Sequence, residues 1–133
     1  MQLPKHATVA VIDGEKFNLF RNAGDEVDLR LVPVEHGAID GHKGADHGRQ
    51  NSSGNPDASQ ASEDGHSAGV AAWLNKAVLE GKIAKLMIIA SPRTLGAVRQ
   101  HYHAKLSEVL LGEIARDLTG HPVHDVEKAV AAH

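Results

Sequence analysis

The residues best placed for chemistry follow an apolar run in the stretch 86–96, LMIIASPRTLG. Residues 86–89 are typical of a strand that is covered on both faces. Ser91 then suits an N-cap and Pro92 the first helical position, where its fixed φ and missing N–H cost nothing. Unpaired backbone N–H groups, the helix dipole and the charge of Arg93 would attract a phosphate or a carboxylate to this junction.

The same junction also has a purely structural interpretation. In that interpretation Ser91 and Pro92 only start a helix, and Arg93 is a solvated residue of its first turn. Strand-to-helix junctions greatly outnumber anion sites, so the sequence physics alone favours the structural interpretation.

Other catalytic arrangements find little support in the sequence. Asp13 ends the first apolar strand, where a nuclease of the ribonuclease H type places one carboxylate, but that chemistry needs several carboxylates around Mg²⁺. We therefore interpret Asp13 as a turn residue. Ser91 has no partner histidine by spacing, and Gly-x-Ser-x-Gly and Walker-type motifs are absent. We expect no catalytic residue and no cofactor.

The ten histidines of the chain raise the question of a metal site. Neutral imidazoles are good ligands for Zn²⁺, Ni²⁺ or Cu²⁺, and His36, His42, His47 and His66 share one stretch. Their spacing matches no compact metal-binding motif, and a mobile loop would have to become ordered on binding. We therefore predict adventitious metal capture at most and no dedicated metal site.

Length and composition indicate one domain in a reducing compartment. A chain of 133 residues is large enough to bury a core, and the absence of cysteine removes disulfides and thiolate metal sites. Only one Lys and a short apolar run precede Asp13, which predicts no signal peptide. No stretch approaches the roughly 18 apolar residues of a membrane span. We therefore expect a cytoplasmic protein with no membrane partner.

Charge and aromatic content limit the kind of nucleic-acid contact to expect. The formal net charge is -3 with neutral histidines, so no global basic field exists and any such contact must come from a local patch. We expect no DNA partner. Phe17, Phe20, Trp73 and Tyr102 are the only Phe, Trp and Tyr residues, which argues against the stacking platforms common in single-strand binders.

The first third of the chain reads as three strands followed by a long loop. Residues 8–12 are an apolar strand that Asp13-Gly14 should fold back as a hairpin onto residues 16–21. Residues 27–34 alternate as a third, half-exposed strand. Residues 35–66 are rich in Gly, Ser, Asp, Asn and His, and predict one long mobile loop. Such a loop is either functional or a dispensable insertion.

The rest of the chain reads mainly as helices around the strand at 86–90. Residues 67–80 carry a helical stripe, with Gly81 as a helix-ending residue. Leu95, Val98, Tyr102 and Leu106 continue helical spacing after that strand. Residues 107–118 either prolong this helix or form a strand over 109–116, and periodicity does not decide between the two. Pro122 should open a last helix with its valines facing inward.

Three segments carry a resemblance that covers nearly the whole chain apart from the Gly- and His-rich loop. They are VIDGEKFNLFR near the start, ASPRTLG in the middle, and GEIARDLTGHPVHDVEKAV near the end. Together they resemble the bacterial family named for attachment to host cells, which is also described as a bacterial relative of the archaeal and eukaryotic peptide-release factors. The combination of ASPRTLG with the downstream RDLT is the most specific part of the resemblance.

The resemblance implies an α/β fold with the ribonuclease-H-like core of the release-factor central domain. That core has three layers: a five-stranded mixed sheet that begins with three antiparallel strands, with helices on both faces. On this analogy residues 109–116 are the fifth strand, and residues 116–119 lead to the last helix.

The resemblance also gives the long loop a possible role. In release factors the corresponding loop carries a Gly-Gly-Gln tip that reaches the ribosomal peptidyl-transferase centre. Here the region reads KGADHGRQNSSG, and the loop-tip candidates are His47, Gly48, Arg49 and Gln50. The two adjacent glycines before glutamine are missing, so we assign no catalytic role to Gln50.

Three hypotheses on function follow. The first is a non-catalytic release-factor-like module that binds ribosomal or transfer RNA. Its candidate contacts are Ser91, Arg93, Thr94, Arg99, Lys43 and Arg49, through salt-dependent contacts with the RNA backbone. The second is an attachment or surface-interaction protein, as the family name suggests. The third is a protein that binds a small anion at the Ser91 junction, and self-association stays open in all three.

Overall fold

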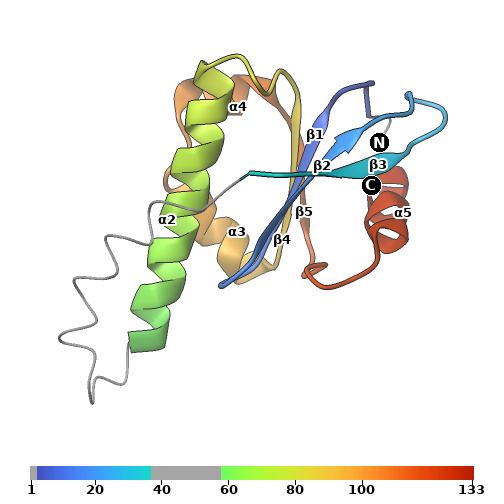
Figure 1. Cartoon of the computed structure of the whole chain (residues 1–133). Coiled ribbons are helices and arrows are strands. Elements are labelled where there is room, and N and C mark those ends of the chain that lie inside the picture. Colours follow the sequence, from blue (N-terminus) through green and yellow to red (C-terminus); the bar gives the residue numbers. More distant parts are fainter. Residues whose placement is uncertain (1–2, 37–57) are drawn as a thin grey trace.

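The chain folds into a mixed β-sheet with helices on both faces, seen edge-on in Figure 1. This computed structural model describes residues 3–36 and 58–133, with the side chains of the first long helix described from residue 65. The strands are β1 (Thr8–Ile12), β2 (Phe17–Asn22), β3 (Leu31–Val34), β4 (Leu86–Ala90) and β5 (Leu110–Ala115). They lie in the order β3-β2-β1-β4-β5. Antiparallel pairing joins β1, β2 and β3, and parallel pairing joins β1, β4 and β5, which confirms the predicted mixed sheet.

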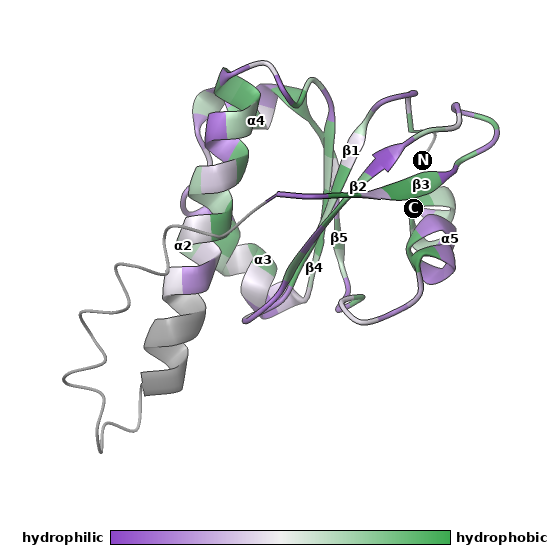
Figure 2. Cartoon of the chain, in the orientation of Figure 1, coloured by the Kyte–Doolittle hydropathy of each residue, from purple (hydrophilic) through white to green (hydrophobic). Residues whose placement is uncertain are grey.

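Helices α2 (Ala58–Leu79), α3 (Pro92–Arg99) and α4 (Ala104–Val109) cover one face of the sheet. Strand side chains point alternately to the two faces, and Figure 2 shows the apolar sides of the helices turned toward the sheet. The core on this side comes from the following buried residues: Ala10, Ile12, Phe17, Leu19, Leu86, Ile88 and Ala90 of the strands, with Val70, Leu74, Leu95, Val98 and Leu106 of the helices.

Among the helices of the described residues, α5 (Val123–Ala132) is the one that covers the opposite face. Its inward residues Val126 and Val130, both predicted to face the core, are buried, while Val123 is half-buried. The strands supply the alternate set of this second core: Val9, Val11, Leu31, Met87, Ile89 and Ile114. Helices therefore lie on both faces of the sheet, as predicted.

The long predicted loop ends earlier than the sequence suggested. Helix α2 begins at Ala58, whereas the composition predicted a loop over 35–66 and a helix only from residue 67. Residues 58–66 contain few large apolar side chains, but they contain no proline and include alanine, glutamine and glutamate, which favour helix. A helix already packed on the sheet can be extended through such residues at little cost. Residues 37–57 of the predicted loop lie outside the described residues.

The third strand is shorter than predicted. It begins at Leu31 instead of residue 27, because residues 24–30 form a turn held by side chains. Asp25 Oδ1 accepts hydrogen bonds from the backbone N–H groups of Val27 at 2.9 Å and Asp28 at 2.7 Å. Val27 is 91% exposed, so this apolar side chain does not belong to a buried face of the strand. The Asp25 side chain thus takes backbone N–H groups that a strand would use, and a turn forms despite the alternating apolar and polar residues.

The helical spacing through Leu106 is divided between two helices. The break between α3 and α4 is held by Asn75 of α2, whose Nδ2 donates to the carbonyl of His101 at 2.8 Å while its Oδ1 accepts from the N–H of His103 at 2.9 Å. His103 then caps α4 by accepting from Lys105 N at 3.0 Å. The next element is strand β5, which agrees with the family analogy and not with a prolonged helix.

Asn22 joins the amino-terminal segment to the turn between β2 and β3. Its side chain is fully buried, with Nδ2 donating to the carbonyl of Leu3 at 2.9 Å. Its Oδ1 accepts from the N–H groups of Gly24 at 2.9 Å and Arg30 at 3.1 Å. Removal of this side chain would leave several backbone groups without partners in a buried place.

We therefore predict that Asn22→Ala lowers the free energy of unfolding by about 2–4 kcal/mol, because buried unpaired polar groups cost about 1–3 kcal/mol each. Urea unfolding followed by circular dichroism measures the change. Asn18→Ala, an exposed position in the same strand, is the matched control and should stay within about 0.5 kcal/mol of the parent protein. Equal stability of the two variants would contradict the role of Asn22.

Candidate functional site

The carboxyl ends of β1, β4 and β5 meet at one edge of the sheet. In the strand register Ile12 pairs with Ala90, and Ala90 pairs with Ala115. The next residue of each strand is therefore Asp13, Ser91 or Arg116, and the three follow side by side. Because ligands of α/β proteins bind at the carboxyl ends of parallel strands, this edge is the candidate site.

The structure confirms the predicted helix start at Ser91. Ser91 is the N-cap of α3 with Pro92 at the first helical position, and its Oγ accepts a hydrogen bond from Thr94 N at 3.4 Å. The Ser91 hydroxyl also donates to Thr94 Oγ1 at 3.1 Å, and Thr94 is buried. Both hydroxyls thus serve the cap. Arg93 is exposed on the first turn, where its charge can face a ligand.

Asp13 is tied to the loop that leads from β5 to α5. Its Oδ1 accepts hydrogen bonds from the backbone N–H groups of Glu15, at 2.7 Å, and Lys16, which confirms its predicted role in the turn. Its Oδ2 accepts from Thr119 Oγ1 at 2.7 Å. Thr119 Oγ1 also lies 2.7 Å from Asp117 Oδ1. The single proton of the Thr119 hydroxyl is therefore shared between, or donated to one of, two carboxylates, and its bond to Asp13 joins segments more than a hundred residues apart.

These contacts set the charge state of Asp13. Partial burial acts to raise its pKa, but the hydrogen bond from Thr119 and those from the N–H groups of Glu15 and Lys16 outweigh burial, so that the pKa lies below the ordinary value of 3.8. Asp13 is therefore an ionised hydrogen-bond acceptor at neutral pH. Within residues 3–36 and 58–133 no three His, Asp or Glu side chains are grouped to hold a metal ion.

Arg99, a predicted anion contact, is already engaged with β5. Its Nε and Nη2 donate to Glu113 Oε1 at 3.0 Å and 2.7 Å, and Tyr102 Oη donates to Glu113 Oε2 at 2.7 Å. The hydrogen bond from Arg99 lowers the pKa of Glu113 despite partial burial, and the bond from Tyr102 adds to this. Burial and the contact with Glu113 raise the pKa of Tyr102. Arg99 thus fastens α3 to β5, an interaction that helical periodicity could not predict.

Two of the four histidines considered as metal ligands contact the β1–β2 hairpin instead. His36 Nε2 lies 2.7 Å from the carbonyl of Phe17, and His66 Nε2 lies 3.2 Å from that of Lys16. A carbonyl only accepts, so Nε2 of each ring donates the hydrogen bond and is not itself a metal ligand in this arrangement. His42 and His47 lie outside the described residues.

A groove lies beside the candidate edge on the face covered by α5. Its volume is about 740 Å³. It is lined by residues of β2, β3 and the loop before α5: Asn18, Leu19, Phe20, Pro33, Val34, Glu35, His36, Gly120, His121 and Val123. The β5–α5 loop therefore contributes Thr119 to the hydrogen bond with Asp13 and, one residue later, Gly120 to the wall of this groove.

The remaining predicted contacts fall in the part of the chain that the structure does not describe. Lys43 and Arg49, predicted to bind RNA, and His47, Gly48 and Gln50, predicted to form the loop tip, lie outside the described residues. The described residues bring together Ser91, Arg93 and Thr94, and place Arg99 against β5. Sequence reasoning missed Thr119 and Asp117, although they belong to the RDLT segment of the resemblance.

The comparison with known families agrees with the fold and with this edge. Residues 6–130 match the family described as bacterial archaeo-eukaryotic release factor family 12. The chain belongs to this family. The match includes the ASPRTLG and RDLT segments that form the candidate edge. The narrower ribonuclease-H-like classification of the fold stays a prediction.

One curated relative is similar to part of the chain. An uncharacterized protein of Rickettsia prowazekii (strain Madrid E) is 45% identical over 53 residues, which are 40% of this chain. The match spans only 35% of that relative's length.

None of the helices in the described part of the chain combines the length and apolar character needed to cross a membrane.

We predict that Thr119→Val raises the pKa of Asp13 toward its ordinary value, because the carboxylate loses the hydroxyl that stabilises its charge. The depressed pKa contributes stability above pH 3.8, the ordinary value, and this stability is lost as the pH falls through the lower folded-state pKa. The variant should therefore be about 1 kcal/mol less stable at pH 7, with a smaller difference in acid.

Carboxyl-carbon NMR titration of Asp13 measures this pKa directly. Thr119→Ser, which keeps the hydroxyl, is the matched control and should leave the pKa of Asp13 low. An unchanged pKa in Thr119→Val would show that the 2.7 Å contact has no electrostatic effect.

Proposed function

We propose that the protein is a translation-associated, release-factor-like module that binds ribosomal or transfer RNA in the cytoplasm and does not itself catalyse hydrolysis. The observation that carries this proposal is the family match over residues 6–130, which includes both segments of the candidate edge. Release factors act on the ribosome, so RNA is the partner that the family relationship favours.

The chemistry of the edge supports a contact with the RNA backbone. Arg93 and Arg116 are exposed beside the amino terminus of α3, where a cation and the helix dipole both favour a phosphate. The ionised carboxylate of Asp13, which accepts bonds from Thr119 and from turn N–H groups, also lies at this edge, so the arginines must supply the attraction for an anion. Phosphate contacts of this type position a protein on RNA without reading sequence.

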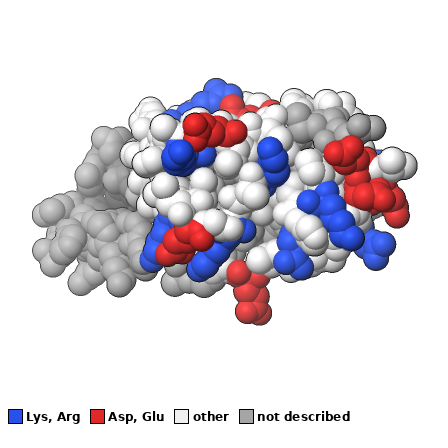
Figure 3. Space-filling model, turned by 90° about the horizontal axis from the view of Figure 1, so that it is seen from above, with Lys and Arg blue, Asp and Glu red and all other residues white. Residues whose placement is uncertain are grey.

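The binding surface is expected to be local and not a broad basic field. Figure 3 views the molecule from the side of the amino-terminal ends of β1 and β4, and on that face Lys and Arg side chains are interspersed with Asp and Glu. The formal net charge of -3 agrees with this mixture. A few arginines must therefore provide most of the electrostatic attraction, which makes single substitutions informative.

The proposal concerns binding because the sequence of the tip differs from that of release factors. No two of the 13 glycines are adjacent, so the 133 residues contain no Gly-Gly-Gln. The proposed module would then occupy a site on the translation machinery without cleaving the ester bond of peptidyl-tRNA.

Co-sedimentation with ribosomes tests the proposal. We expect association at low salt that weakens as salt rises, with each lost phosphate contact reducing the logarithmic salt slope by roughly 0.7–0.9. Arg93→Gln and Arg116→Gln should each weaken binding several-fold. Lys128→Gln, an exposed position on α5, is the matched control with the same charge change. Absence of association at low salt would refute the proposal.

Attachment to host cells and binding of a small anion remain predictions from the sequence. Cell fractionation would support the attachment role if the native protein were found outside the cytoplasmic membrane. Titration with inorganic phosphate, followed by NMR shifts at Ser91 and Arg93, would support the small-anion role if binding occurred without RNA.

A further inference from the structure

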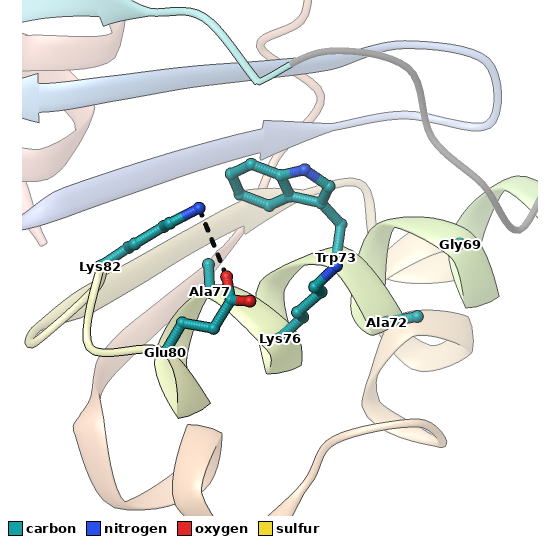
Figure 4. Close-up of a pocket in the computed structure, with 7 residues that line it drawn as sticks. All are labelled: Gly69, Ala72, Trp73, Lys76, Ala77, Glu80 and Lys82. Atoms are coloured by element: carbon teal, nitrogen blue, oxygen red, sulfur yellow. Dashed lines mark ion pairs between the residues drawn. The ribbon is translucent and has the colours of Figure 1, made fainter.

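A second groove, of about 310 Å³, lies along the flank of α2 that faces the β2–β3 side of the sheet. Trp73 and Lys76 line it from α2, and Lys82 reaches it from the turn that follows the helix. Figure 4 shows the indole of Trp73 and the side chain of Lys82 extending into the same space. Gly69, which has no side chain, and Ala72, which has only a methyl group, also line the groove and leave space beside the ring.

The indole of Trp73 is held in place by two other rings. The Phe17 ring lies 5.6 Å from it and the His36 ring 5.9 Å, both in edge-to-face arrangements. Phe17 and His36 also contact each other at 4.3 Å, and His36 is fixed by its bond to the carbonyl of Phe17. Trp73 is half-buried and lines the groove, so an oriented aromatic surface remains in contact with it.

The charges around the ring favour an anionic ligand. Lys76 is exposed, and the side chain of Lys82 is 72% exposed. Glu80 is the one acidic residue lining the groove, and it lies 3.3 Å from Lys82. An ion pair this exposed is weak, so a phosphate can displace Glu80 from Lys82. Two cations therefore flank one aromatic surface.

We propose that this groove binds a nucleotide of single-stranded RNA, with the base stacked on Trp73 and the adjacent phosphates contacted by Lys76 and Lys82. Stacking on an aromatic side chain combined with lysine contacts to the backbone is how proteins bind single strands without sequence preference. A groove of about 310 Å³ is at the small end of ligand sites, which suits one nucleotide. An acidic peptide would use the lysines but would gain little from the indole.

This inference rests on the proposed function only for the choice of RNA, and it places the contact on α2, away from the edge at Ser91. The proposed function and the proposed nucleotide site can therefore be refuted independently of each other. Purified oligonucleotides test the groove without ribosomes, and the fluorescence of Trp73, which lines the groove, reports on it and not on the edge at Ser91.

The test uses the fluorescence of Trp73, the sole tryptophan of the chain. We expect short single-stranded oligouridylate and oligoadenylate RNA to quench this fluorescence in a saturable way at low salt. Duplex RNA and polyglutamate should quench much less, because neither presents an unstacked base. Equal quenching by polyglutamate would overturn the proposal in favour of an acidic peptide, and no quenching by single strands would overturn it outright.

Variants assign the contact to named residues, with labelled RNA and anisotropy as the measurement. Trp73→Leu should weaken binding about tenfold or more. Lys76→Gln and Lys82→Gln should each weaken it several-fold and reduce the logarithmic salt slope by roughly 0.7. Glu80→Gln should strengthen binding, because it removes the competitor for Lys82, and Lys128→Gln should have no effect.

Trp73→Leu also removes packing against Phe17, so its effect alone would not separate binding from folding. The exposed positions Lys76, Glu80 and Lys82 provide that separation, since their substitution leaves the core intact. Unchanged affinity in Lys76→Gln and Lys82→Gln, with their folding verified by circular dichroism, would refute the assignment to this groove.

Discussion

The parallel pairing of β1 with β4 at the centre of the sheet is the constraint on which the rest of the structure depends. Every residue of both strands is buried, with helices packed against each face. Two strands covered on both sides are nearly all apolar, and the polar residue Thr8 stands at the start of β1. Asp13 and Ser91 are the first residues beyond the carboxyl ends of the two strands, and the register places them side by side.

Several polar side chains at this edge bond to one another. Ser91 and Thr94 bond to each other, Asp13 bonds to Thr119, and Arg99 bonds to Glu113. These interactions hold α3, β1 and the β5–α5 loop in a rigid arrangement. A ligand would meet a prepared surface with exposed arginines, which suits binding more than nucleophilic or metal-assisted chemistry.

The two proposals, one for the edge at Ser91 and one for the groove on α2, together describe a protein that would contact RNA at two places. The low aromatic content of the chain argued against a stacking surface. Composition, however, carries no information on where the few aromatic rings lie in the fold. The fold nevertheless packs Phe17 from β2 and His36 from beyond β3 against Trp73 of α2, and Trp73 lines the groove. One oriented tryptophan ring between two lysines can stack on a base even where a surface with several aromatic residues is absent.

The sequence by itself determined the central strands, the capped start of α3 at Ser91 and Pro92, and the last helix, because each depends on neighbouring residues. It left residues 107–118 undecided and misplaced the start of α2, since partly buried and weakly patterned segments take their structure from what packs against them. Only the tertiary structure joined Asp13 to Thr119, engaged Arg99 with Glu113 and placed Trp73 beside Lys82. Those contacts link distant segments, and local spacing cannot specify which distant residues will meet.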